Sequence, residues 1–158
     1  MGHKEGFDQM DNRDIILGEI QSAMSRLLGD SAAAVMRQAG RSCSLRLWPE
    51  LPGNKSPEEA LTLMAESLKG LEGWGEFSVM GIEGDTAKIQ FKNCYFPTFT
   101  EASGKPCGQQ PICFFGYGLL EETFRRLTGI TVKVELDVRD DETCTCHEIL
   151  TMKRVGTT

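Results

Sequence analysis

Five cysteines of this 158-residue chain fall within one stretch, from residue 94 to residue 146. Thiolates are soft ligands that favour zinc, cuprous copper or iron–sulfur clusters. The N-terminus is polar and unlike a secretory signal peptide, so we expect a reducing, cytoplasmic setting in which clustered thiols favour a metal over disulfides. The sixth cysteine, Cys43, is expected to be an ordinary core residue. The candidate metal ligands are therefore Cys94, Cys107, Cys113, Cys144 and Cys146.

The spacing of these cysteines says which kind of centre they suit. A zinc site usually offers closely spaced Cys pairs, whereas Cys94 and Cys107 are separated by a long gap that an iron–sulfur cluster tolerates better. On a strand, Cys144 and Cys146 point to the same face and His147 to the other. We expect Cys94, Cys107 and Cys146 to share one centre, with Cys144 or Cys113 as the fourth ligand. Core packing is the alternative for Cys113, and His3 and His147 are expected at the surface.

The net charge and the hydropathy pattern limit the classes of partner that the chain is expected to bind. The formal net charge is −6, from 17 basic and 23 acidic residues. An acidic chain without a basic block is a poor candidate for non-specific nucleic-acid binding. No apolar run approaches the roughly 20 residues that span a bilayer. The sequence thus predicts neither nucleic-acid binding nor a membrane span.

Helical patterns fill the first half of the chain. Residues 1–10 read as a flexible tail, and residues 11–158 as a single domain with a helical part (11–73) and a sheet–helix–sheet part (74–158). We expect a helix from Asn12, a short helix from Ser31 to Ala39 ended by Gly40, and a third helix after Ser56, where Glu59 completes a capping box.

The second half alternates between strand and helix patterns. The spacing predicts strands at 76–82, 86–93, 131–138 and 143–152, and a helix over 111–128. Val132, Val134, Leu136 and Val138 are expected on one side of their strand. Residues 94–110 form a long loop of the kind that is often functional. This order predicts an α+β fold with an antiparallel sheet packed against helices on one face.

Aromatic residues surround the cysteines and could line an apolar pocket. Ordinary core packing is the alternative for them, because a domain of this size buries its aromatics. The candidates are Phe91, Tyr95, Phe96, Phe99, Phe114, Phe115 and Tyr117.

Residues 93–149 resemble the 4-vinyl reductase, or hydrocarbon-binding, domain superfamily. The similarity lies in a Cys with aromatics opening a Gly-containing helix (112–120), a Leu-Thr-Gly helix end (127–129), and a hairpin whose second strand carries Cys146 before Glu148-Ile149. The resemblance implies an α+β sandwich related to a vesicle-tethering particle subunit. It also implies a binding or sensory domain for small apolar molecules, commonly a homodimer, and we expect the helix from Asn12 to Leu28 at the interface.

The superfamily's aromatic-sensing regulators imply a particular zinc site. Their ligands would fall on Cys113, Glu135 and Cys146, with Val138 standing where the pattern has a Cys. That site is incomplete unless Cys144 or Cys107 substitutes.

A second similarity fits the other cysteines. The Cys module of Suf-operon repressors, and of thiazoline-carboxylate hydrolase-like proteins, looks like Asn93-Cys94, Cys107 and then Cys144 or Cys146. In the repressors these positions hold an iron–sulfur cluster. Because no full winged helix fits before Trp74, the chain is not expected to be a repressor.

The sequence therefore favours a non-catalytic small-molecule-binding or sensory domain with a Cys-ligated iron–sulfur or zinc centre. One alternative is a hydrolase of the thiazoline-carboxylate hydrolase-like type, with a Cys nucleophile or a metal-activated water. Another is an assembly subunit that needs no metal.

Overall fold

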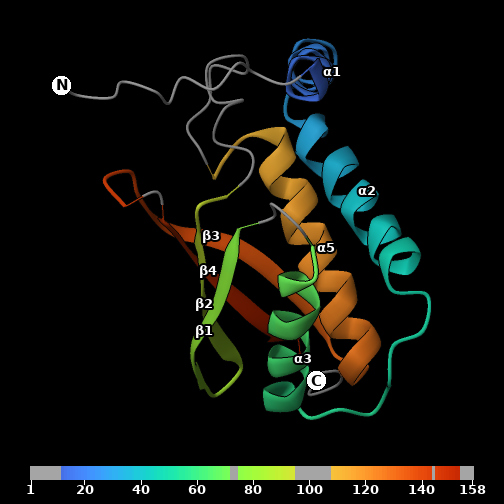
Figure 1. The fold of residues 1–158 in the computed structure, drawn as a ribbon, viewed down its shortest axis with the longest axis vertical. Coiled ribbons are helices and arrows are strands. Elements are labelled where there is room, and N and C mark those ends of the chain that lie inside the picture. Colours follow the sequence, from blue (N-terminus) through green and yellow to red (C-terminus); the bar gives the residue numbers. More distant parts are fainter. Residues whose placement is uncertain (1–11, 72–74, 95–107, 144, 154–158) are drawn as a thin grey trace, which may run out of the picture.

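A computed structural model describes residues 12–71, 75–94, 108–143 and 145–153. Helices α1 (Asn12–Leu28), α2 (Ser31–Leu47) and α3 (Pro57–Lys69) come first. Strands β1 (Glu76–Glu83) and β2 (Thr86–Lys92), helix α5 (Pro111–Thr128), and strands β3 (Thr131–Asp140) and β4 (Thr145–Lys153) follow (Figure 1). Among the described residues, no helix is both long and apolar enough to cross a membrane.

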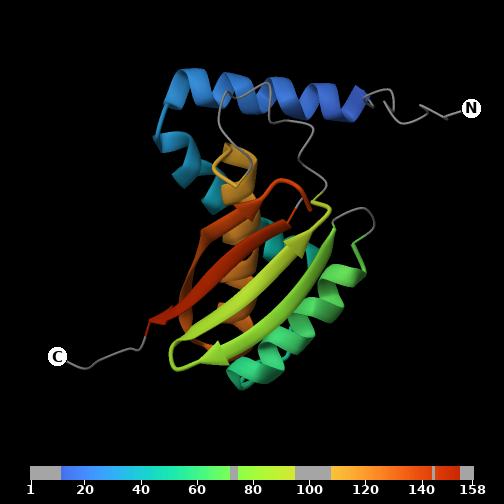
Figure 2. The same ribbon diagram turned by 90° about the vertical axis from the view of Figure 1, so that its left-hand side faces the viewer.

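The four strands form one antiparallel sheet in the order β1-β2-β4-β3. Helices α3 and α5 cover one face of this sheet, and none of the described helices covers its other face (Figure 2). Inward residues alternate with outward ones along β2 and β4, as expected for a sheet with one buried face. The predicted α+β fold, with helix 111–128 packed on an antiparallel sheet, is confirmed.

Helix α5 is the centre of the core. Phe124, Leu119 and Leu127 on this helix are at most 1% exposed, and they belong to the same buried cluster as Met64 of α3 and Val134 of β3. Pro111 begins the helix, and Gly129 ends it in a left-handed conformation (φ 77°) that glycine adopts without strain. Both ends of α5 lie where the sequence predicts them.

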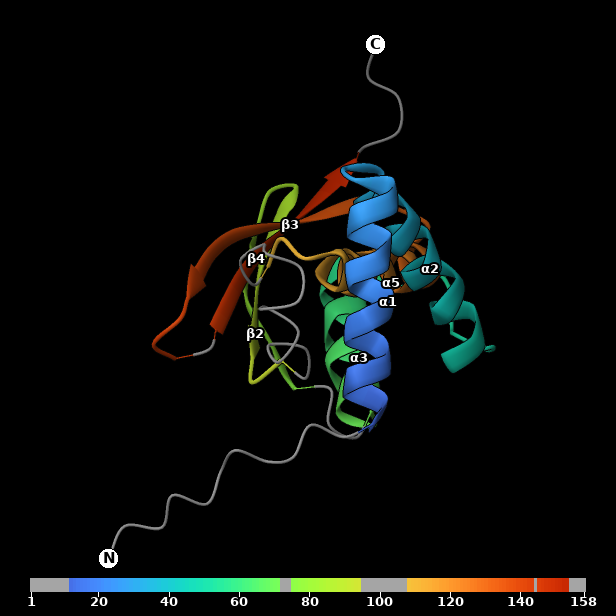
Figure 3. The ribbon, with the colours of Figure 1, turned by 90° about the horizontal axis from the view of Figure 1, so that it is seen from above.

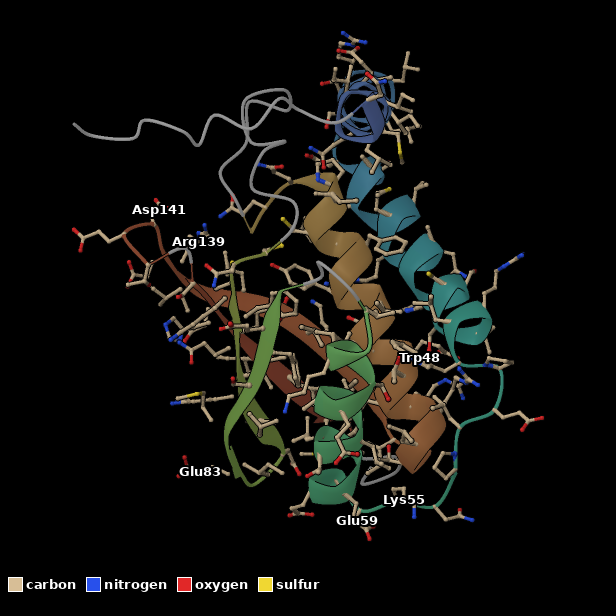
Figure 4. All side chains as sticks on the ribbon, in the orientation of Figure 1. Trp48, Lys55, Glu59, Glu83, Arg139 and Asp141 are labelled. Carbon is tan, nitrogen blue, oxygen red and sulfur yellow. The ribbon has the colours of Figure 1, made fainter. Side chains whose placement is uncertain are left out.

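The start of α3 also follows its sequence signal. The Glu59 amide donates a hydrogen bond to the Ser56 hydroxyl (3.2 Å), and the Ser56 amide donates one to the Glu59 carboxylate (2.9 Å). This reciprocal pair is the predicted capping box. It fixes the segment between α2 and α3, which contains Lys55, to the first turn of α3 (Figure 4).

Helix α2 is longer than predicted. It continues through Gly40 to Leu47, because Gly40 serves close packing rather than a helix end. A Cβ at Gly40 would overlap the carbonyl oxygen of Phe115, and a Cβ at Gly118 would overlap that of Arg37. The two glycines thus let the backbones of α2 and α5 approach each other directly.

The prediction that Val138 faces inward with Leu136 is wrong. The pairing of β3 with β4 shifts register between Leu136 and Val138, so Asp137 is an extra residue. Such a bulge reverses the facing of the residues beyond it. Val138 is therefore 54% exposed, and Arg139 lies opposite Cys146 of β4.

A buried carboxylate on α5, that of Glu121, joins this helix to α2 and to β3. Glu121 is 3% exposed and accepts a hydrogen bond from Arg41 of α2 (2.7 Å) and another from the Val134 amide of β3 (3.1 Å). Arg37 lies 3.5 Å away from the same carboxylate and donates to the Val134 carbonyl (2.9 Å). These contacts fix α2 and β3 to α5, and they therefore hold α5 in position beside the sheet.

Candidate ligand-binding site

An apolar cavity of about 50 Å³ lies between the first half of α5 and strands β2 and β4. Larger surface grooves, of about 460 and 500 Å³, lie around the β1–β2 turn, but their walls hold no buried titratable group. The wall of the cavity beside α5 does contain a buried titratable group, that of Glu148, and this cavity is therefore the candidate site. Its walls are Gly108; Ile112, Cys113, Gly116, Tyr117 and Leu120 of α5; and Phe91, Cys94, Cys146 and Glu148 from the sheet side.

Helical spacing explains the α5 wall. Ile112, Gly116 and Leu120 recur every four residues, which places them on one face of the helix. A Cβ at Gly116 would meet nothing within 4 Å, so the missing side chain contributes open space. The Tyr117 hydroxyl donates a hydrogen bond to the Gly108 carbonyl (2.7 Å) and holds the residues before α5 against the cavity.

Glu148 is the polar group of the cavity. Its side chain lies on the inward face of β4, with Ile89 and Leu136 opposite it on the two neighbouring strands. The residue is 7% exposed, and its Oε2 atom has no hydrogen-bond partner among the described residues. Burial, together with the nearby Cys146, raises the pKa of Glu148 to about 8. The carboxyl group is therefore largely protonated, and able to donate, near neutral pH.

Cys146 lies on the same face of β4, and its sulfur is contacted by Arg139 of the neighbouring strand β3. Its sulfur accepts a hydrogen bond from the guanidinium of Arg139 (3.2 Å), and Arg139 also contacts the Asp141 carboxylate at 3.2 Å. Arg139 and Asp141 lie at the far end of β3 (Figure 4). A guanidinium beside a sulfur stabilises negative charge on it. The sulfur, which is 6% exposed, borders the cavity.

Three of the five cysteines predicted as metal ligands line this one cavity. Cys113 accepts a hydrogen bond from the Gly108 amide (3.2 Å), Cys94 follows the end of β2, and Cys146 lies on β4. Cys107 and Cys144 are outside the described residues. Within the described ranges, no three His, Cys, Asp or Glu side chains are arranged to hold one metal ion. A metal centre would need the two remaining cysteines and stays a prediction.

The other predicted residues lie in several places. Glu135, from the zinc pattern, is exposed and pairs with Lys133 (2.8 Å) outside the cavity. Cys43 lies on α2 away from the cavity, and burial raises the pKa of its thiol. Phe91 and Tyr117 line the cavity, whereas Phe114 and Phe115 do not; Tyr95, Phe96 and Phe99 lie outside the described residues.

Sequence reasoning missed Glu148, Arg139 and Gly116 as site residues. Glu148 could have been found, because it shares its strand parity with Leu150 and Met152 and an acidic residue on a buried face is unusual. The sequence pattern gives no indication that Arg139 faces inward, because only the bulge at Asp137 turns its side chain to that face.

Helix α1 is attached to the first turn of α5, next to the cavity. The Gln21 side chain donates a hydrogen bond to the Gln110 side chain (3.1 Å) and accepts one from the Ile112 amide (2.9 Å). Seen from above, α1 lies over α5 and α2, away from the sheet (Figure 3). Gln21 therefore links α1 to an element that forms the cavity wall.

Several solved structures are similar to this chain. The phenol-responsive sensory domain of the transcription activator PoxR, with phenol, is similar at 14% identity over 88% of this chain and 74% of that chain (TM-score 0.61). A variant of Tt H-NOX is similar at 14% identity over 94% and 76% of the two chains (TM-score 0.54). A trafficking protein particle complex subunit 3 from Naegleria fowleri, covalently bound to palmitic acid, gives a TM-score of 0.47 at 14% identity over 90% and 96%. No protein-family model and no curated protein matches the sequence.

Proposed function

We propose that this chain is a small-molecule-binding sensory domain whose ligand lies in the cavity between α5 and the sheet. The observation that carries the proposal is Glu148, a buried carboxyl group that faces an apolar cavity without a hydrogen-bond partner among the described residues. Burying a polar group without a partner costs about 2 kcal/mol or more. A ligand that supplies the partner offsets this cost whenever it is bound.

The walls define the chemical class of the ligand. Apolar side chains such as Ile112, Leu120 and Phe91 surround one polar group, which is the usual composition of a small-molecule site. A cavity of about 50 Å³ is smaller than the roughly 150 Å³ that holds a benzene ring, so a compact molecule enters only as the walls move apart, and a long chain fits less well still. We therefore propose a small apolar ring compound that carries one hydrogen-bonding group, directed at Glu148.

The similarity to sensory domains supports this proposal at the level of fold. The PoxR domain, solved with phenol, and the H-NOX variant have the same α+β arrangement. At 14% identity this likeness says nothing about which residues bind a ligand. The ligand class proposed for this chain therefore rests on its own cavity.

A route for the signal leads from the cavity to α1. Ile112 lines the cavity, and its amide donates the hydrogen bond that holds Gln21. A ligand that moves the first turn of α5 would change this contact and shift α1. The outer side of α1 is apolar and exposed, which suits contact with a second copy of the chain. We propose a homodimer through Ile15, Ile16, Leu17 and Ile20, which are 45, 59, 37 and 52% exposed.

Calorimetric titration with cyclohexanone, phenol and benzyl alcohol tests the proposed function. At least one of these compounds should bind to the wild-type protein. Gly116→Leu fills the cavity and should weaken that binding about tenfold or more, since the ligand loses at least about 1.4 kcal/mol. Ala34→Leu, at an exposed position on α2, is the matched control and should bind as the wild type does. Binding that Gly116→Leu leaves unchanged, or no binding by any of the three, would refute the proposal.

A metal centre in the same cavity is a second candidate. It is favoured by the position of Cys94, Cys113 and Cys146 around one space. Thiolates so arranged, with Cys107 and Cys144 added, suit an iron–sulfur cluster or zinc, which would organise the loop between the first two cysteines.

A further inference from the structure

Two thiols that line the cavity, those of Cys113 and Cys146, accept hydrogen bonds from different kinds of donor. The sulfur of Cys113 accepts its hydrogen bond from a backbone amide, that of Gly108. The sulfur of Cys146 instead accepts one from the guanidinium of Arg139, at 3.2 Å. A cationic donor favours the negative charge that a thiol needs in order to act as a nucleophile.

The contact with Arg139 depends on a local departure from regular strand pairing. The bulge at Asp137 brings Arg139 opposite Cys146, and Asp141 holds the other side of the guanidinium. The Arg139 side chain is 12% exposed, so its charge acts on the sulfur through little solvent. Bulges commonly re-aim a side chain in this way next to functional sites.

We propose that Cys146 captures an apolar α,β-unsaturated carbonyl compound by covalent addition in this cavity. The inference rests on the proposed function, because it assigns the ligand class of the same site. A second observation supports it independently of the thiol. Glu148, 93% buried and without a partner among the described residues, faces the same cavity and can donate a hydrogen bond to a carbonyl oxygen.

The step balances without a further reactant. The sulfur of Cys146 forms a bond to the β-carbon, and the carbon–carbon π bond breaks. Its electron pair moves through the conjugated system to the carbonyl oxygen, where the Glu148 carboxyl donates a hydrogen bond to the developing enolate. The proton that the thiol loses ends on the α-carbon, so the product is a thioether that keeps its carbonyl group. No group leaves, and nothing is oxidised or reduced.

The spacing of the two residues suits this class of compound. Cys146 and Glu148 are two residues apart on one face of a strand, so their Cα atoms are about 7 Å apart. A conjugated enone carries its electrophilic carbon and its oxygen at opposite ends of a short, flat unit. Such a unit can therefore meet the sulfur at one end and the carboxyl group at the other, while its ring lies against Phe91 and Leu120.

The test uses the whole chain, reduced and treated with a chelator, and cyclohex-2-enone as the probe. Intact-mass and peptide mass spectrometry should find one added enone, first on Cys146. Arg139→Gln should slow the reaction at Cys146 about tenfold or more, because a hydrogen bond to a charged group is lost, and Arg139→Lys should restore part of the rate. Glu148→Gln, which can still donate, should react close to the wild-type rate, and Glu148→Leu more slowly.

Internal controls separate reactivity from unfolding. Cys43→Ser, on α2 away from the cavity, leaves the contact between Arg139 and Cys146 in place, and Cys146 should react normally in this variant. The reaction of Cys43 in the same molecules reports loosening of the fold, so the ratio of the Cys146 rate to the Cys43 rate measures the effect of Arg139. Addition at Cys43, Cys94 or Cys113 before Cys146, or an unchanged ratio in Arg139→Gln, would overturn the inference.

Cyclohexanone separates failure of this inference from failure of the proposed function. It has the same ring and carbonyl group but no electrophilic double bond, and it should bind reversibly and slow the addition of the enone. If cyclohexanone binds and the enone does not add, the covalent step is wrong and the binding function stands. If neither compound engages the cavity, the covalent step is wrong, and the binding function fails with it when phenol and benzyl alcohol do not bind either.

Discussion

Cys146 and Glu148 lie two residues apart on the inward face of β4, where a thiol held by a guanidinium and a carboxyl group without a partner among the described residues face one apolar cavity. Cys146 belongs to the buried core cluster, whereas the Glu148 carboxyl group does not. Phe91 lies opposite the first, and Ile89 opposite the second, so both polar groups are set among hydrophobic neighbours. Burial of the Glu148 carboxyl group in such surroundings lowers the stability of the fold, which is reasonable only if the cavity binds a ligand.

The raised pKa of Glu148 makes a prediction about stability and pH. The pKa is about 8 in the folded protein and near 4.5 when unfolded, so the folded state binds the proton more tightly. The contribution of this group to stability is then fully present below pH 4.5 and is lost as the pH rises to about 8. The loss is at most about 5 kcal/mol, at about 1.4 kcal/mol for each pKa unit.

Urea unfolding of the wild type and of Glu148→Gln, from pH 4 to pH 9, measures this effect. The amide does not titrate, so the difference in unfolding free energy between the two proteins should change across that window, with the wild type losing stability relative to the variant. Parallel curves for the two proteins would contradict a buried, largely protonated Glu148.

The close packing of α2 on α5 predicts opposite effects at two glycines of the same helix. Gly118→Ala would press a methyl group into the backbone of Arg37 and should destabilise the fold by about 1–3 kcal/mol or more. Gly116→Ala meets open space and should stabilise the helix by up to about 1 kcal/mol. Urea denaturation checks both variants, and a Gly118→Ala protein as stable as the wild type would contradict the packing.

Much of this fold could be predicted from the sequence, since local signals and burial agree in α3, α5 and the strands. The predictions failed where a residue has a tertiary role. Gly40 looks like a helix end in the sequence, but it allows α5 to approach, which depends on a helix far along the chain. The bulge at Asp137 leaves no mark in the alternating pattern, so both the exposure of Val138 and the inward position of Arg139 were missed.

The candidate site was predicted less completely for the same reason. The clustering of cysteines drew attention to the part of the chain that borders the cavity, because Cys94, Cys113 and Cys146 line it. The cavity, however, exists because no side chain fills the space beside Gly116, and the spacing of residues along the chain does not predict such a space. Glu148 becomes notable only once its neighbours are known to be apolar.

The apolar outer side of α1 predicts a homodimer. Light scattering at micromolar concentration should give the mass of two chains. Replacing Ile16 and Ile20 together by Lys should yield monomers, because burial of these side chains against the second copy is lost. Val35→Lys, at an exposed position on α2, is the control and should leave the dimer intact. A wild-type monomer at this concentration would contradict the proposed interface.

A metal centre makes a separate prediction. Protein purified without oxygen should contain iron with sulfide, or zinc, and an iron–sulfur cluster would show in the visible spectrum. Cys→Ser at position 94, 107 or 146 should remove the metal and lower thermal stability, because metal binding adds to the folding free energy. Cys43→Ser should change neither property. A wild-type protein free of iron and zinc would leave the thiols to the ligand-binding role.

The central claim is that a small apolar molecule binds beside Glu148, and mapping of amide chemical shifts tests it most directly. Titration of labelled protein with cyclohexanone, phenol and benzyl alcohol should move the amide signals of Gly116, Cys146 and Glu148. Signals of the β1–β2 turn, around Gly84 in the larger surface groove, should stay in place. Shifts confined to that turn, or no saturable shift with any of the three compounds, would contradict the account.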